Sequence, residues 1–156
     1  MNNTLSIFTS PEGEDRFDEA YNNMFALWPV PHEVLDVDTR FGRTHINVSG
    51  PKDAPPLVLL HAAGFSSIAW FANIGALSQI RRAYAVDIIG DAGKSRISRQ
   101  LKSGEDHADW LNDVLDGLAV DHADMLGHSQ GGWMALAFPL KYPNRVNKLK
   151  IGRAHV

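Results

Sequence analysis

The sequence predicts an α/β domain built on a doubly wound, mostly parallel β-sheet. Short apolar segments alternate along the chain with amphipathic segments of helical period, which is typical of this class. The continuous apolar run Leu57–Leu60 predicts a strand that is buried on both faces of the sheet. Ser129 lies among the close-set glycines of Gly127–Gly132 (GHSQGG), after a strand-like segment and before a helix-forming one. These three features predict strands joined by right-handed helical crossovers.

An amphipathic helix is expected near the N-terminus, outside the sheet. Ser10 is a suitable helix cap, Pro11 suits a first turn, and apolar residues follow at helical spacing. The prolines of Trp28–Pro31 end this helix, because each removes a backbone donor and displaces the residue before it from helical geometry. We therefore assign residues 1–33 to an N-terminal helical extension and residues 34–150 to a partial sheet domain.

The first strands of that domain are expected to form a hairpin. Residues 34–39 and 44–48 have the composition of strands, with a tight turn at Phe41–Arg43. After the buried strand at Leu57–Leu60, a helical segment from about Ser67 to Gln79 precedes a second buried strand. That second buried strand is Arg82–Ile89. It is followed by a helix from about Asp106 to Leu118, a strand at Asp121–Leu126, a helix at Trp133–Lys141 and the start of a strand at Val146–Lys150.

Small-residue loops follow three of the predicted parallel strands. They are His61–Gly64, Asp87–Ser95 and Gly127–Gly132. Ligand sites in such sheets form outside the carboxyl ends of the strands, so these loops are expected to meet at one edge. A serine at a sharp strand-to-helix turn needs small neighbours, because the turn is crowded. The pattern therefore indicates a nucleophile elbow, although a serine in an ordinary glycine-rich turn is the simpler alternative.

Composition excludes several classes of protein. The chain has 156 residues, 44% apolar and 21% charged, with a formal net charge of -3 and no cysteine. No basic stripe indicates nucleic acid, no apolar run approaches membrane-spanning length, and Met1–Ser10 lacks the pattern of a signal peptide. The absence of cysteine excludes thiol catalysis and is compatible with a reducing compartment. We expect a cytoplasmic protein without nucleic-acid or membrane partners, and the sequence carries no signal for an oligomeric state.

The order strand, HAAG loop, strand, DIIGDAGKS loop, helix, strand and GHSQGG resembles the α/β-hydrolase superfamily. Three segments are similar in sequence to bacterial serine carboxylesterases of this fold, including their N-terminal helical extension. They are SPEGEDRFDEAY, LWPVPHEVLDVDTRFGRTHINVSGPKDAPPLVLLHAAGFSS and YAVDIIGD. The resemblance covers nearly all of the first 149 residues. It implies hydrolysis of a small-molecule carboxylic ester by a serine nucleophile, without a metal or an organic cofactor.

The resemblance also implies roles for particular residues. Ser129 would be the nucleophile, and the backbone N–H groups of Gln130 and Ala63 would form the oxyanion hole. The family usually has glycine after the histidine of the HAAG loop, where this chain has Ala62. If that position needs a positive φ, alanine adds roughly 1 to 2 kcal/mol of strain. His61 is expected to hydrogen-bond within the loop, because it ends the wrong strand for a catalytic base.

The segment Gly93–Ser95 (GKS) invites a rival interpretation as a phosphate-binding loop. That motif needs a glycine five positions before Gly93, where this chain has Ile88. We therefore interpret the segment as a solvated turn that shapes the pocket.

The partners of a catalytic serine are missing from the rest of the sequence. In this fold the acid and then the histidine follow the serine, yet no Asp or Glu follows Ser129, and the only later histidine is His155. Residues 151–156 bear no relation to the family's continuation and resemble the translation of a common sequencing-adapter oligonucleotide. We expect the N-terminal half of an esterase, with an incomplete triad, a non-native tail and little activity of its own.

Two other classes of function stay open at the level of sequence. A non-catalytic α/β-hydrolase-like binding protein would also retain the fold, and its natural end would lie here. Other hydrolases share the architecture, including thioesterases, lipases and peptidases, so the fold alone does not specify the reaction.

Overall fold

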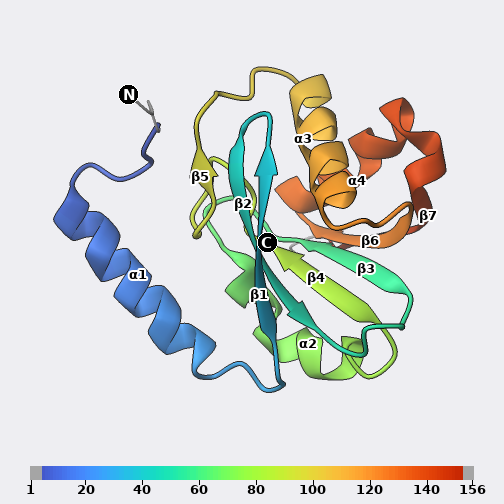
Figure 1. The fold of residues 1–156 in the computed structure, drawn as a ribbon, viewed down its shortest axis with the longest axis horizontal. Helices are drawn as coiled ribbons and strands as arrows, with labels where there is room; N and C mark the ends of the chain where they lie inside the picture. The colour runs from blue at the N-terminus through green and yellow to red at the C-terminus, as the bar shows by residue number, and fades with distance from the viewer. Residues whose placement is uncertain (1–4, 153–156) are drawn as a thin grey trace.

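The structure is a computed structural model that describes residues 5–152. Within that range a seven-stranded sheet forms the centre, and helices pack on both of its faces (Figure 1). The strands are β1 (Glu33–Thr39), β2 (Gly42–Ser49), β3 (Pro56–Leu60), β4 (Arg82–Val86), β5 (Arg96–Ile97), β6 (Ala123–His128) and β7 (Val146–Gly152). The helices are α1 (Pro11–Phe25), α2 (Phe71–Leu77), α3 (Gly104–Gly117) and α4 (Gln130–Lys141), with the 3-10 turns η1 (Ser67–Trp70) and η2 (Pro143–Arg145).

The sheet has the order β1-β2-β4-β3-β6-β7, and the short strand β5 pairs with β2. Strands β4, β3, β6 and β7 are parallel to one another, whereas β1 and β2 form an antiparallel hairpin that joins the sheet through antiparallel pairing of β2 with β4. The prediction of a doubly wound, mostly parallel sheet is confirmed. The carboxyl ends of the four parallel strands therefore lie at one edge.

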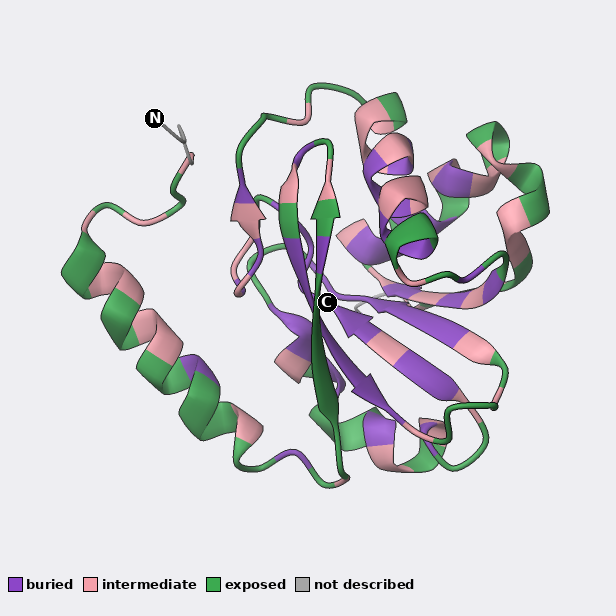
Figure 2. Cartoon of the chain, viewed as in Figure 1, coloured by how far each residue is buried: buried purple, intermediate pink, exposed green. Residues whose placement is uncertain are grey.

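Alternate residues of the central strands face two separate hydrophobic cores. Val58 and Leu60 of β3 belong to the core beneath α3 and α4. Leu57 and Leu59 belong to the core beneath α2, which also contains Trp70. Figure 2 shows β3 and β4 almost entirely buried, as the continuous apolar run predicts.

Buried hydrogen bonds among three polar side chains connect the N-terminal extension to the sheet domain. The Tyr21 hydroxyl of α1 lies 3.1 Å from Ser67 Oγ and accepts a hydrogen bond of 2.9 Å from Asn47 Nδ2. Burial, and then the nearby charge of Asp87, raise the pKa of the Tyr21 phenol far above its ordinary value. The hydroxyl therefore stays neutral, so it can serve as both donor and acceptor within this group.

Several boundaries differ from the sequence-based expectation by a few residues. The predicted helix from Ser67 begins as the 3-10 turn η1 and continues as α2 only to Leu77. The second buried strand ends at Val86 rather than Ile89, because the chain turns at Asp87, whose carboxylate accepts backbone hydrogen bonds from two loops.

The two later helices both begin before their predicted starts. Helix α3 begins at Gly104 instead of Asp106, because the Ser103 hydroxyl caps it by accepting from the Asp106 N–H at 3.1 Å. Helix α4 begins at Gln130 rather than Trp133. The elbow serine is therefore the N-cap residue of its helix, closer to the helix than its glycine-rich surroundings indicated.

The last strand reaches two residues beyond the predicted domain boundary at 150. Ile151 and Gly152 pair with Gly127 and His128 of β6. His155, and the rest of the expected tail after Gly152, lie outside the described residues.

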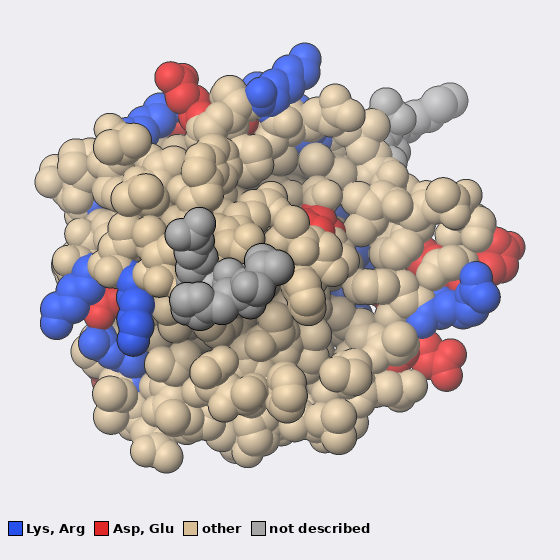
Figure 3. Space-filling view, turned by 180° about the vertical axis from the view of Figure 1, so that it is seen from behind, with Lys and Arg blue, Asp and Glu red and all other residues tan. Residues whose placement is uncertain are grey.

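No helix within residues 5–152 is long and apolar enough to cross a membrane. The face turned away from the viewer of Figure 1 carries acidic and basic side chains interspersed around its rim (Figure 3).

Candidate active site

The turn between β6 and α4 holds Ser129 in a strained backbone conformation. Its φ of 52° and ψ of -113° lie in a region that residues with a Cβ rarely adopt. The Ser129 N–H donates to the Gly152 carbonyl at 3.2 Å, and the Ser129 carbonyl accepts from the Trp133 N–H at 3.0 Å. These hydrogen bonds join β7 and the first turn of α4 to the serine, and so hold it at the carboxyl edge of the sheet.

The glycines on either side of the serine are required by close backbone contacts. A Cβ on Gly127 would overlap the Gly131 carbonyl, and a Cβ on Gly131 would overlap the Leu60 carbonyl at the end of β3. The Gly131 N–H also donates to the His61 carbonyl at 3.1 Å. The elbow and the HAAG loop are therefore in direct contact, as the sequence predicts for loops at one edge of the sheet.

Two backbone donors predicted for an oxyanion hole lie on these adjoining loops. Leu60 pairs with Gly127 across β3 and β6, so the loops that follow these strands begin side by side. Among residues 5–152, neither the Ala63 N–H nor the Gln130 N–H has a hydrogen-bond acceptor. Such unpaired N–H groups can donate to an oxygen of a bound ligand.

The alanine that departs from the family pattern is not strained. In the described part of the chain, the non-glycine residues with positive φ are Ala119 and Ser129. Ala62 therefore has an ordinary φ, and the positive φ of this loop falls on Gly64, at 74°. The strain considered for Ala62 from the sequence does not occur, because the following glycine takes up the turn.

His61 is a structural residue, as the sequence predicts. Its ring is fully buried, Nε2 accepts from the Ile88 N–H at 2.9 Å, and Nδ1 lies 2.8 Å from the Ala62 carbonyl. Because a backbone N–H can only donate, Nε2 must be unprotonated and Nδ1 must carry the hydrogen. Burial lowers the pKa of this imidazole below 6.5. The ring therefore stays neutral and joins the loops after β3 and β4.

We expect this histidine to make the fold less stable in acid. Between the lowered pKa of folded His61 and the ordinary value of 6.5, the unfolded chain binds more protons than the folded one. The contribution of neutral His61 to the free energy of unfolding should therefore be complete above pH 6.5, and it should decrease as the pH falls below that value. Urea titrations across this pH range should show a steeper loss of unfolding free energy in the parent chain than in His61→Phe. At neutral pH, His61→Phe should be roughly 2 to 4 kcal/mol less stable than the parent.

The exposed His122 provides the matched control for this measurement. His122→Gln should keep the full pH dependence of the parent chain. Equal pH dependence in the parent and in His61→Phe would contradict the assignment of His61 as a buried neutral base.

The GKS segment wraps around a buried carboxylate and leaves no phosphate cradle. Asp87 is fully buried, and its Oδ2 accepts from the Lys94 N–H at 2.7 Å. The Ser95 hydroxyl donates to the Asp87 carbonyl at 2.6 Å. These donors are already used within the protein, which agrees with the rejection of a phosphate-binding loop. The prediction that the turn is solvated is wrong for Gly93 and Ser95, which are buried because the segment packs around Asp87. The sequence drew attention to the segment but did not identify Asp87 as its centre.

Two cavities flank the elbow. One of about 560 Å³ is lined by His128 and Gly152 together with residues of α2. The other, of about 470 Å³, is lined by Gln130, by Asp91 of the loop after β4 and by the segment Leu5–Ile7. A ligand bound at the serine would have space on both sides.

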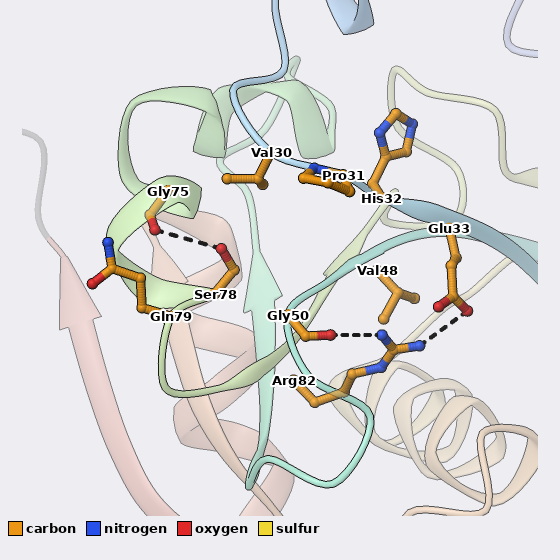
Figure 4. A pocket seen from close by; sticks show the side chains of 10 residues that line it. All are labelled: Val30, Pro31, His32, Glu33, Val48, Gly50, Gly75, Ser78, Gln79 and Arg82. Carbon is orange, nitrogen blue, oxygen red and sulfur yellow. Dashed lines mark hydrogen bonds and ion pairs between the residues drawn. The ribbon is translucent and has the colours of Figure 1, made fainter.

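A further cavity of about 420 Å³ lies far from the serine, at the opposite ends of the parallel strands (Figure 4). It is lined by Arg82, the first residue of β4, whose guanidinium donates to the Gly50 carbonyl at 2.9 Å and to Glu33 at 3.1 Å. This arginine is already paired, and the cavity contains no elbow-like backbone. We therefore place the candidate active site at Ser129.

The serine has no catalytic partner in the described part of the chain. Ser129 Oγ makes no hydrogen bond to any of residues 5–152. In the same range, no group of three or more His, Asp or Glu side chains could hold a metal ion. The described site thus consists of the strained serine at the turn and two backbone N–H groups without an acceptor.

The comparisons with known proteins agree with this geometry. Residues 55–150 match the family described as alpha/beta hydrolase fold. The chain is 47% identical over 141 residues to Carboxylesterase YbfK of Bacillus subtilis, covering 90% of this chain and 48% of that protein. It is 44% identical over 150 residues to a second B. subtilis protein, named uncharacterized carboxylesterase nap, covering 96% and 50%.

The crystal structure of naproxen esterase (carboxylesterase NP) from B. subtilis superimposes with a TM-score of 0.87 at 45% identity, covering 91% of this chain and 50% of that one. The chain thus spans about half the length of the curated relatives it matches. The sequence match, the fold and the strained serine at the elbow together show that this chain belongs to the α/β-hydrolase fold family.

Proposed function

We propose that this chain supplies the nucleophile and the oxyanion hole of a serine carboxylesterase. The observation that carries the proposal is the strained Ser129 between β6 and α4, followed directly by the unpaired N–H of Gln130. An elbow of this form exposes a serine hydroxyl next to a backbone donor. The relatives that match most of the chain are named as carboxylesterases, which favours esters over the other substrates of the fold.

The proposed reaction proceeds through an acyl-enzyme. Ser129 Oγ attacks the acyl carbon of the ester, and the carbonyl oxygen becomes an oxyanion that accepts from the N–H groups of Gln130 and Ala63. Collapse of this intermediate breaks the bond to the alcohol, which leaves with a proton. Water then attacks the acyl group on Ser129 and releases the carboxylic acid.

The base that takes the serine proton is proposed to lie outside the described residues. His61 cannot serve, because both of its ring nitrogens are engaged with backbone groups. We propose that the complete enzyme carries an acid and a histidine beyond this half of the sheet, in the order typical of the fold. A cytoplasmic location belongs to the same proposal, supported by the absence of cysteine.

A chimera tests the proposal. Residues 1–150 of this chain would replace the matched N-terminal part of YbfK, so that the remainder of YbfK follows in register. We expect the chimera to hydrolyse p-nitrophenyl butyrate, measured as release of p-nitrophenol, and the isolated 156-residue chain to show no turnover above background. A chimera that unfolds cooperatively on heating but hydrolyses no ester would contradict the proposal. Turnover by the isolated chain that Ser129→Ala abolishes would contradict the placement of the base.

A further inference from the structure

The turn that carries Ala63 is exposed and is not held by side-chain packing. The Phe65 N–H donates to the Ala62 carbonyl at 3.2 Å, which places Ala63 and Gly64 at the centre of a β-turn. Gly64 has a φ of 74°, typical of the third residue of a type II turn. Within residues 5–152, no atom other than those of Gly64 and its two chain neighbours lies within 4 Å of where a Cβ on Gly64 would be. Contacts other than packing must therefore set the orientation of this turn.

The loop after β4 supplies those contacts. The Asp91 carboxylate accepts the Gly64 N–H with both oxygens, at 2.9 Å and 3.1 Å. Asp91 is itself held, because its N–H donates to the Ile88 carbonyl at 3.2 Å and its Oδ1 accepts from the Ala92 N–H at 2.8 Å. The carboxylate is therefore a fixed acceptor rather than a freely rotating side chain.

Two more hydrogen bonds flank this one along the same pair of loops. The Ile88 N–H donates to His61 Nε2 before the turn, and the Ser67 N–H donates to Asp87 Oδ1 at 2.8 Å after it. The segment from Asp87 to Asp91 thus holds the chain between His61 and Ser67 at its start, middle and end. In the middle, Asp91 contacts the residue that directly follows Ala63.

We propose that Asp91 is a positioning residue for the oxyanion hole, and this inference rests on the proposed function. The peptide between the two central residues of a β-turn can take either of two orientations, and glycine tolerates both. An acceptor on one side selects the orientation in which the Gly64 N–H points toward it. This choice fixes the turn from which Ala63 presents its own N–H to the substrate oxygen.

A pair of substitutions in the chimera separates the acceptor from the charge. Asp91→Ala removes the acceptor, and we expect kcat to fall roughly 10- to 100-fold with KM changed less than about twofold, because a misplaced donor weakens transition-state binding selectively. Asp91→Asn retains an oxygen acceptor, so kcat should stay within about threefold of the parent. Asp53→Ala, which removes an exposed carboxylate elsewhere, should leave both constants unchanged.

Inhibitor binding and thermal unfolding show whether the effect is on the transition state. A trifluoromethyl ketone forms a tetrahedral adduct whose oxygen occupies the oxyanion hole. Its affinity should fall in Asp91→Ala by about the same factor as kcat, while the unfolding midpoint stays close to that of Asp91→Asn. Equal kcat in Asp91→Ala and the parent would overturn the inference. An equal loss in Asp91→Asn and Asp91→Ala would also overturn it, because charge would then be the cause.

The hydrogen bond from the Gly64 N–H to the Asp91 carboxylate can also be tested on the 156-residue chain, without any measurement of catalysis. We expect the Gly64 amide to exchange with deuterium roughly tenfold faster in Asp91→Ala than in the parent, because its hydrogen-bond acceptor is lost. Asp91→Asn should retain most of the protection. An inactive parent chimera would count against the proposed function alone. An unchanged rate of deuterium exchange at the Gly64 amide in Asp91→Ala would overturn the inference that Asp91 holds this turn.

Discussion

Replacing Ser129 with alanine in the chimera is expected to lower kcat for ester hydrolysis by on the order of a million-fold. The loss should be this large because, in the proposed mechanism, the hydroxyl forms the covalent intermediate and no other described side chain can replace it. KM and the circular dichroism spectrum should change little. The measurement is the initial rate of p-nitrophenol release at saturating ester, with the enzyme purified from a host that lacks background esterase.

The same position should show the cost of holding a serine in this conformation. A residue with a Cβ at φ 52° and ψ -113° carries roughly 1 to 3 kcal/mol of strain, which glycine avoids. Ser129→Gly should therefore be inactive yet about 1 kcal/mol more stable to urea than the parent, after allowing for the greater entropy of unfolded glycine. Ser129→Ala, which keeps the Cβ, should match the parent in stability. A less stable glycine variant would contradict the strained geometry.

Replacing Gly131 with alanine is expected to have the largest effect on the fold. The new Cβ would overlap the Leu60 carbonyl, a backbone atom at the end of the central strand β3. Because neither backbone can move without disturbing the sheet, we expect a loss of about 3 to 5 kcal/mol of unfolding free energy. Esterase activity of the chimera should disappear together with the elbow.

Gly75 offers a matched control for this substitution. It lies inside α2, and an added Cβ would meet its nearest atom, Pro29 Cγ, at 4.0 Å. Gly75→Ala should therefore be neutral or stabilise the protein by up to about 1 kcal/mol. Urea denaturation of both variants tests this contrast, and equal stabilities would show that the contact between the elbow and β3 is not as close as described.

The succession of helices and strands along the chain could be predicted because its signals are local. Leu57–Leu60 is an uninterrupted apolar run, and it forms a strand with residues in both cores. Ser10 and Pro11 mark the start of α1 by their own chemistry, and the Ser10 hydroxyl accepts from the Gly13 N–H at 3.1 Å. The two-residue strand β5 was not predicted, because its pairing with Gly42 and Arg43 depends on the hairpin rather than on its own sequence.

The site could be predicted only in part, for a similar reason. The glycines around Ser129, together with the strand-like segment before them and the helix-forming segment after them, indicate a crowded strand-to-helix turn, so the elbow could be predicted from the sequence. The role of Asp91 could not, because its partner Gly64 lies 27 residues away along the chain. The role of Asp87 could have been predicted in part, because an acidic residue beside a strand predicted to be buried suggests a carboxylate with backbone hydrogen-bond partners.

The most direct test of Ser129 as nucleophile is mass spectrometry of the chimera after reaction with a fluorophosphonate. This reagent loses fluoride when an activated serine oxygen attacks its phosphorus, and it leaves a stable phosphonyl group on that serine. We predict a single adduct, on the proteolytic peptide that contains Ser129, and its absence from Ser129→Ala. Modification of a different serine in an active chimera, with Ser129 unmodified, would contradict the assignment of the nucleophile.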